Sequence, residues 1–542
     1  MTLESEILEL WAGLFPVEGY KAGLSQCQGR LFHNTEASLY QAKADIARLQ
    51  SRLDEVADPH LRTTAIKLLL CFQAQLEINF PADQVHDCAD GVYVVLLKGD
   101  QGAPFVAKYL AEVEGALREE TARWCNYDAS LETRKLCLDS ADYLRETLTI
   151  LKGENPDLSA ACNEIMDSLA AFEKLFVIPE LQGDDFETFY TLLQRQNRAP
   201  QPTPEYPRLL SDLYDYPETA EEMHQKALDW LEAEMPRVKE LANKIGLAYG
   251  LSEGATIEQV YAVMDEHNPV GVDALAEATS LIEVVNRYTA VHILGFGPED
   301  RIVLERTPTY LEPLGTEGSL LSLNYLTASP KRICYITPSK NKSRLTMINV
   351  LVHEYGHGFH ESMTGRLASS PLLKIPTPLM TPLTEAIAFH REWEFWEDAD
   401  ALLKRAELAP EERDYLTLFG AEKEIQRQTV QAFELETRFW RIARFLRILG
   451  DVEVHLGLRT HVDFVEWAHA QTGLSKKFIH DATFSFLKSP GYAPCYAIAG
   501  MKLGELQRDA LPRGMSRREF NTWASSMGYW PRTIYEQMLT TK

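Results

Sequence analysis

Residues 345–360 read Leu-Thr-Met-Ile-Asn-Val-Leu-Val-His-Glu-Tyr-Gly-His-Gly-Phe-His. The apolar residues in the first half of this stretch predict a buried helix. Residues four apart lie on one face of an α-helix, one turn from each other, so His353 and His357 share a face. Two imidazoles in this arrangement can bind one Zn²⁺, and Glu354 is offset enough to reach a water held by the metal. The stretch therefore predicts a zinc-binding helix that also carries a general base.

Three short segments before this helix predict a small antiparallel sheet. Residues 301–306, 319–325 and 332–337 are rich in β-prone side chains and are bounded by Pro, Gly or Ser. Ser343 lies between the last segment and the helix, where its hydroxyl is suited to the N-cap position. The histidine pattern defines only three residues, but an apolar helix directly after a sheet is the context that zinc peptidases require.

The third metal ligand is expected from a second helix. A longer zinc pattern places a glycine three residues beyond the second histidine and another histidine three further on. Those positions are His360 and Met363 here, so this pattern fails. The alternative is a glutamate from a following helix, and Glu385 fits it. Thr381 and Pro382 suit the N-cap and N1 positions, which puts Glu385 in the first helical turn.

A second glutamate follows on the same predicted helix. Residues 379–393 read Leu-Met-Thr-Pro-Leu-Thr-Glu-Ala-Ile-Ala-Phe-His-Arg-Glu-Trp. Glu392 lies two turns beyond Glu385 on the same face, where its carboxylate can accept a hydrogen bond from an imidazole that binds zinc. An acidic residue on an amphipathic helix is usually only part of a solvated face, so both assignments depend on the histidine pair upstream.

These residues resemble a known family. His353-Glu-Tyr-Gly-His-Gly-Phe-His360, followed by Glu385 and then Glu392-Trp393, resembles the gluzincin metallopeptidases of the thimet oligopeptidase and oligoendopeptidase family. The chain is more distantly similar to thermostable metallocarboxypeptidases and to uncharacterised bacterial gluzincin-like proteins. The resemblance covers about residues 300–400 and a segment near 489–507. It implies a mainly α, two-lobed fold with a deep channel that admits only short, unfolded peptides.

In the same family, a segment near the C-terminus provides hydroxyl groups that take part in the reaction. Residues 489–496 read Ser-Pro-Gly-Tyr-Ala-Pro-Cys-Tyr, which matches the family's Gly-Tyr-x-x-x-Tyr core. The resemblance implies Tyr496 as the first choice for the group that stabilises the oxyanion, and Tyr492 as the second. The alternative for each is a packed aromatic side chain without a role in the chemistry.

Two positions depart from the family pattern. Leu487 stands where the family has a histidine, and Ala499 stands where it has a further tyrosine. His480, a turn or more upstream, is a candidate replacement for the missing histidine, although a surface or core role suits it better.

The rest of the chain predicts a mainly α protein. Helical periodicity dominates to about residue 295 and resumes after the predicted strands. We predict a helical lobe at 1–295 that covers the channel, and a catalytic domain at 296–542 that contains the sheet, both ligand helices and the C-terminal helices. The predicted helical segments of the first part are 34–54, 59–79, 104–125, 135–152, 158–177, 218–246 and 272–293.

The composition argues against several kinds of partner. The 542 residues include 54 basic and 79 acidic ones, a formal net charge of −25, which repels nucleic acid and anionic membrane surfaces. The eight cysteines are scattered without a CxxC pair, as is typical of reduced thiols. The N-terminal residues lack the basic region of a signal peptide, and no stretch approaches the roughly 20 apolar residues of a membrane span. We expect a cytoplasmic protein.

Taken together, the residues predict zinc-dependent hydrolysis of peptide bonds in short peptides, with one zinc per chain. His353, His357 and Glu385 bind the metal, Glu354 is the general base, and a tyrosine stabilises the oxyanion. One alternative is a carboxypeptidase that trims peptide C-termini, which needs a cationic group to hold the substrate carboxylate; spacing alone does not single out one of the arginines. Another is a helical protein that binds zinc without catalysis, but the intact Glu354 favours an enzyme. The oligomeric state stays open.

Overall fold

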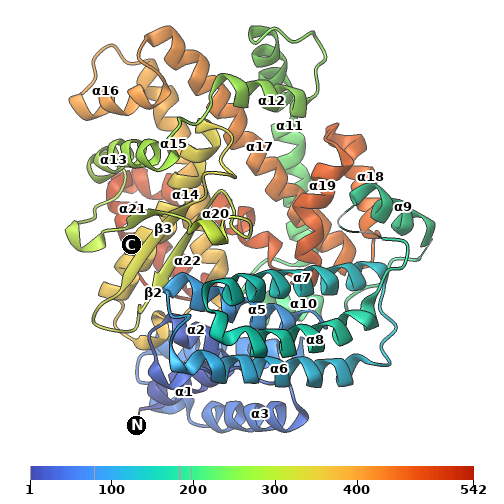
Figure 1. Ribbon diagram of the computed structural model, residues 1–542. Coiled ribbons are helices and arrows are strands. Elements are labelled where there is room, and N and C mark those ends of the chain that lie inside the picture. The colour runs from blue at the N-terminus through green and yellow to red at the C-terminus, as the bar shows by residue number, and fades with distance from the viewer. Residues whose placement is uncertain (1, 79, 182, 184, 197, 542) are drawn as a thin grey trace. The chain divides into compact units, whose positions relative to one another are not determined.

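A computed structural model describes residues 2–78, 80–181, 183, 185–196 and 198–541. Helices make up most of the chain, and the described strands form one small sheet, which confirms the mainly α prediction (Figure 1). None of the described helices is both long and apolar enough to cross a membrane. The chain divides into two compact units, which are described separately below.

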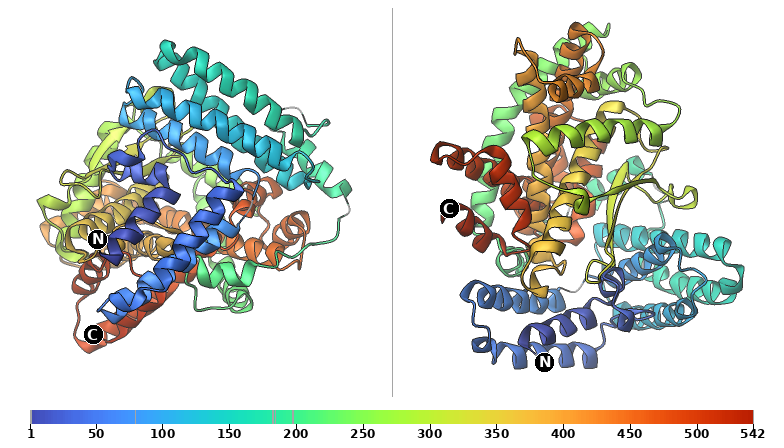
Figure 2. Two further views of the ribbon diagram at one scale, coloured as in Figure 1. Left: turned by 90° about the horizontal axis from the view of Figure 1, so that it is seen from below. Right: turned by 90° about the vertical axis from the view of Figure 1, so that its left-hand side faces the viewer.

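The first unit consists of Met1–Ala199, Leu323–Pro330 and Ser370–Pro376. Within it, α5 packs on α7, and α8 packs on both α6 and α7, as the blue-to-teal helices of Figure 2 show. Asp58 and Ser130 cap α4 and α7 by accepting hydrogen bonds from backbone N–H groups of the first turn. Its helices are α1 (Leu3–Leu14), α2 (Pro16–Lys21), α3 (Glu36–Gln50), α4 (Pro59–Glu77), α5 (Asp83–Lys98), α6 (Pro104–Trp124), α7 (Leu131–Glu154), α8 (Ser159–Phe176) and α9 (Phe186–Gln196).

The second unit consists of Pro200–Ser322, Lys331–Ser369 and Thr377–Lys542. It contains the sheet and the candidate site. Its helices are α10 (Tyr206–Asp212), α11 (Ala220–Ala248), α12 (Ile257–His267), α13 (Ala274–His292), α14 (Arg344–Leu367), α15 (Thr381–Leu403), α16 (Pro410–Leu416), α17 (Lys423–His455), α18 (His461–Thr472), α19 (Lys476–Thr483), α20 (Ala497–Ala510), α21 (Arg517–Ser526) and α22 (Arg532–Thr541).

The seven helical segments predicted before residue 295 correspond to α3, α4, α6, α7, α8, α11 and α13. Residue 79, the last of the predicted segment 59–79, lies outside the described residues. The contacts divide the chain between residues 199 and 200 rather than at 295. Residues 200–295 group with the sheet and the candidate site because α11 packs along α17 (Figure 1). The channel and its cover by an N-terminal lobe stay predictions.

The sheet has the order β1-β3-β2. Strands β1 (Val303–Arg306), β2 (Gly318–Leu323) and β3 (Lys331–Ile336) lie within two residues of the predicted segments. The backbone N–H of Thr337 donates to the Glu317 carbonyl at 3.2 Å, so the start of β2 lies beside the end of β3, as in an antiparallel pair. The pair β1–β3 is parallel. The prediction of a wholly antiparallel sheet was therefore wrong, because β3 turns back and enters between β1 and β2.

Helix α14 lies in the middle of the second unit, in contact with α13, α15, α17, α21 and β3. Its N-terminus follows the prediction, because Ser343 is the N-cap and its hydroxyl accepts a hydrogen bond from the backbone N–H of Leu345. Helix α15 begins one residue earlier than predicted, with Met380 rather than Thr381 as its N-cap, so that Glu385 lies just beyond the first turn.

Candidate metal centre

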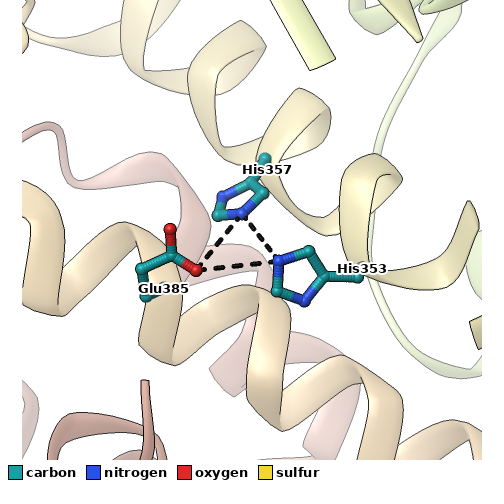
Figure 3. A group of neighbouring side chains, drawn as sticks. All are labelled: His353, His357 and Glu385. Atoms are coloured by element: carbon teal, nitrogen blue, oxygen red, sulfur yellow. Dashed lines mark hydrogen bonds and ion pairs between the residues drawn. The ribbon is translucent and has the colours of Figure 1, made fainter. Parts of the chain in front are cut away.

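Three side chains converge where α14 and α15 cross: His353 and His357 from α14, and Glu385 from α15 (Figure 3). The Nε2 atoms of the two histidines are 3.1 Å apart, and Oε2 of Glu385 is 3.6 Å from each. A tetrahedral zinc with bonds of about 2.0–2.1 Å requires donor atoms roughly 3.4 Å apart. Among the described residues, these three are the one such group of donor atoms within 4.8 Å of one another. The spacing therefore fits a zinc ion.

The hydrogen bonding of the Glu385 carboxylate also suits a metal ligand. Its Oε2 atom is buried and forms no hydrogen bond with the described residues. Burial alone lowers the pKa of His357, but the Glu385 carboxylate outweighs this and raises it to about 9. Two imidazole nitrogens facing each other beside a carboxylate therefore attract a positive charge. Two nitrogen donors and one oxygen donor form the ligand set that zinc takes in many hydrolytic sites.

The three side chains also remain accessible. The exposed fractions are 14% for the side chains of His353 and His357 and 13% for Glu385. A catalytic zinc site keeps one position for water or substrate, whereas a structural site is closed by four protein ligands. Three converging, partly exposed ligands match the open kind.

Glu392 contacts one of the histidines from behind. Its Oε1 atom lies 2.6 Å from Nδ1 of His353. Arg444 of α17 holds the same carboxylate with two hydrogen bonds of 2.7 and 2.6 Å. Burial would raise the pKa of Glu392, but Arg444 and His353 outweigh it and lower the pKa to about 2. The ionised carboxylate accepts a hydrogen bond from the Nδ1–H group of His353, which leaves the lone pair of Nε2 free to bind a metal.

Glu354 lies between the two histidines in sequence and is partly exposed. Its Oε2 atom accepts a hydrogen bond of 2.7 Å from the backbone N–H of Leu320 in β2. Burial raises the pKa of Glu354, although His353 and His357 oppose this effect. A general base needs a pKa above that of an ordinary glutamate, nearer to the working pH, so the shift has the useful sign.

Tyr492 and Tyr496 lie beside each other at the start of α20, with their hydroxyl oxygens 3.4 Å apart. Burial raises the pKa of Tyr496, and the negative charge of Glu385 raises it further. The guanidinium of Arg444, which holds Glu392 behind His353, lies 5.6 Å from the centre of the Tyr496 ring. The structure thus brings the tyrosine pair and the histidine–glutamate group into one region of the second unit. Which hydroxyl acts on a substrate stays a prediction.

A buried carboxylate fixes the turn that carries the tyrosines. Both oxygens of Asp451 accept the backbone N–H of Gly491, at 3.2 and 3.1 Å, and Oδ2 also accepts the Tyr206 hydroxyl at 2.6 Å. Gly491 has φ +85°, and a Cβ there would meet Leu210 and Tyr214 at 3.1 Å. Only glycine meets both conditions without strain. Asp451 therefore positions the turn through its backbone.

The positions that departed from the family pattern lie near this turn in the chain. Leu487 is in the 3₁₀ turn Phe484–Lys488, and Ala499 is buried in α20. The ring of His480 pairs with His461, with Nδ1 and Nε2 3.1 Å apart, and stacks on Phe484 at 4.6 Å. The sequence favoured a surface or core role for His480, and these contacts suit the core role.

The sequence reasoning missed Arg444, although a signal was present. Arginines recur at every third residue of α17 from 438 to 447, within a helix whose other residues are largely apolar and buried. Such a row on a buried helix indicates carboxylate partners, because a lone buried charge is costly.

Gly356 sets the distance between the two ligand helices, because a Cβ at this position would lie 3.1 Å from Cα of Ala388. We expect Gly356→Ala to lower the free energy of unfolding by about 1–3 kcal/mol, the usual cost of overpacking, and to weaken zinc binding as α14 and α15 separate. Urea unfolding and zinc titration measure both effects. As a control, Gly153→Ala on α7 adds a methyl group in open space and should not destabilise the protein. Unchanged zinc affinity in Gly356→Ala would contradict this role.

Comparisons with known proteins place the fold but not the activity. No protein-family model matches the chain, and no curated protein matches it. Two solved structures match over nearly their whole lengths. A "putative lipoprotein of unknown function" from Shewanella oneidensis has a TM-score of 0.67 and 13% identity, covering 99% of each chain. A "putative lipoprotein" from Colwellia psychrerythraea has a TM-score of 0.60 and 14% identity, covering 99% of this chain and 98% of the other.

A third solved structure is a "putative oligoendopeptidase F" from Bacillus anthracis, with 12% identity over 98% of this chain and 92% of the other. Its TM-score of 0.33 is too low to support an argument. The first two matches show that the whole chain shares its fold with those proteins. At such identities the likeness concerns the fold alone.

Proposed function

We propose that this protein is a zinc-dependent peptidase. The observation that supports the proposal best is the triangle of donor atoms, with sides of 3.1, 3.6 and 3.6 Å, formed by His353, His357 and Glu385. Glu354 is the neighbour of His353 in the sequence, and its carboxylate is not needed as a metal ligand. A purely structural zinc site has no use for such a base or for an accessible fourth position.

In the proposed reaction, each side chain has a separate task. Zinc, when bound, polarises the peptide carbonyl and lowers the pKa of its water toward about 7. Glu354 accepts a proton from the attacking water and later delivers it to the leaving amine. Tyr496, or Tyr492 beside it, donates a hydrogen bond to the oxygen on which negative charge develops. Glu392 keeps the His353 ring in its orientation through the bond to Nδ1.

The proposed substrates are short peptides, and nucleic acid and membranes are not expected partners. The preference for short peptides rests on the resemblance of the motif residues to the oligopeptidase family. A cytoplasmic location also stays a proposal. All eight cysteines are free, and all but Cys125 are buried, which suits a reducing compartment.

The metal tests the proposal first. We expect the isolated protein to contain about one zinc per chain, because three converging donors form one site. Glu385→Gln should weaken zinc binding strongly, since it removes the charged ligand, whereas Glu397→Gln on the exposed side of α15 should not. Elemental analysis and competition with a chromogenic chelator measure both. A protein that binds no zinc even after zinc is added back would contradict the proposal.

A further inference from the structure

Arginines occupy every third position of α17 from residue 438 to residue 447, and three of these four form ion pairs with carboxylates. Arg441 and Arg444 are buried and Arg438 and Arg447 are partly buried in the second unit, where an unpaired charge is costly. The ion pairs are Arg438 with Glu234 and Glu434, Arg441 with Glu234 at 3.4 Å, and Arg444 with Glu392.

Arg447, the fourth of the row, differs. No acidic side chain in the described part of the chain forms an ion pair with it. Its Nε atom donates to the Ala482 carbonyl at 3.0 Å, and its guanidinium lies over the rings of Phe486 and Tyr496, with its carbon 4.7 and 5.5 Å from the ring centres. The side chain is partly exposed. The guanidinium is therefore held in place by one hydrogen bond and two rings, while its two terminal nitrogens are left for an anion.

The Tyr496 ring links this cation to the metal ligands. Arg444 and Arg447 both lie over that ring, at 5.6 and 5.5 Å from its centre. The pKa of Tyr496 is raised first by burial and next by the Glu385 carboxylate, and it is lowered by Arg447. The phenol thus lies within electrostatic reach of both groups. Arg444 in turn holds Glu392, whose Oε1 atom lies 2.6 Å from Nδ1 of His353, so the Tyr496 ring lies between Arg447 and a side chain that contacts a candidate ligand.

We propose that Arg447 binds the C-terminal carboxylate of the substrate, so that the protein releases short C-terminal fragments instead of cutting peptides internally. This assignment rests on the proposed peptidase function. A guanidinium offers two parallel N–H donors that match a carboxylate, which makes it better suited than a lysine to this task. An extended chain spans about 3.3–3.6 Å per residue, so an anchor in the neighbourhood of the candidate metal centre favours short fragments, about one to three residues long.

The first test measures binding without turnover. The probes are a pentapeptide of alanine and leucine with a free C-terminal carboxylate, and the same peptide with a C-terminal amide. Calorimetry with the zinc-loaded Glu354→Gln protein should show about 10- to 100-fold tighter binding of the acid, the range of one charge-assisted interaction. In the same Glu354→Gln background, Arg447→Ala should abolish the difference in affinity between the two peptides, and Arg447→Lys should restore part of it. Arg427→Ala, an exposed position on the same helix, should keep the full preference.

The second test measures cleavage by the protein with Glu354 intact. We expect kcat/KM to favour the acid over the amide by a similar factor, and mass spectrometry to identify C-terminal fragments of one to three residues. Arg447→Ala should remove this preference mainly through KM. Equal binding of the two peptides, a preference for the acid that survives in a folded Arg447→Ala protein, or an undiminished preference in a folded Arg447→Lys protein would overturn the assignment. If neither peptide is cleaved, the proposed function fails, and the binding comparison still decides the role of Arg447.

Discussion

Glu354→Gln should leave zinc bound and reduce kcat by about 10²–10⁴-fold, the usual contribution of general-base catalysis. The amide oxygen of glutamine can still accept the hydrogen bond that the Leu320 N–H donates to Oε2, so the local structure should persist. What the amide cannot do is accept a proton from water. Steady-state hydrolysis of a short-peptide mixture and zinc content, measured on the same preparations, separate loss of catalysis from loss of metal.

Glu361→Gln provides the matched control. Glu361 is another carboxylate on α14. It accepts a hydrogen bond from the Ser322 hydroxyl of β2, and burial raises its pKa as it does that of Glu354. It has no place in the proposed reaction, so the variant should keep most of its activity. Wild-type turnover in Glu354→Gln would remove Glu354 from the mechanism, and equal losses in both variants would assign the effect to structure instead.

Arg444→Met should destabilise the protein by about 3–5 kcal/mol, because it leaves the Glu392 carboxylate buried without its main counter-charge. Zinc affinity should also fall by about 10- to 100-fold, since Glu392 orients His353. The double variant Arg444→Met/Glu392→Gln removes both charges and should recover much of the lost stability. Urea unfolding of the four proteins in this cycle measures the coupling between the two side chains. If the losses of unfolding free energy in the two single variants added up to the loss in the double variant, the result would contradict the pairing of Arg444 with Glu392.

The pH dependence of this ion pair has a defined sign. The pKa of Glu392 falls from an ordinary value of 4.5 to about 2 in the folded protein. A lowered folded-state pKa means that the pair stabilises the protein above pH 4.5 and that this contribution is lost as the pH falls from 4.5 toward 2. Glu392→Gln should therefore flatten the dependence of unfolding free energy on pH within that window.

The elements around the candidate site were predictable where the pattern was local. The apolar run, the spacing of four between His353 and His357, and the cap Ser343 were sufficient to predict α14, because helix periodicity and capping depend on residues within one or two turns. Glu385 was found by its position soon after a helix start. The Glu392 contact with His353 followed from the face that it shares with Glu385.

Contacts between distant segments were harder to predict from the sequence. Short β-prone segments predict strands but not their neighbours, so the insertion of β3 between β1 and β2 was missed. The sequence also offered no way to choose among the arginines a candidate for the substrate carboxylate. That choice depends on which arginines already have partners, and the partners of Arg441 and Arg444 lie on α11 and α15, far away in the chain.

The sequence by itself determined which candidate ligands α14 and α15 carry, because a predicted ligand set is a matter of residue types at helical spacing. Only the tertiary structure decided how these side chains are supported: that Asp451 holds the turn before Tyr492, that Arg444 neutralises Glu392, and that no carboxylate among the described residues pairs with Arg447. The physical reason is that each of these facts depends on charges and hydrogen-bond donors brought together from distant segments, whose pairing is fixed by the packing of whole helices and not by any local pattern.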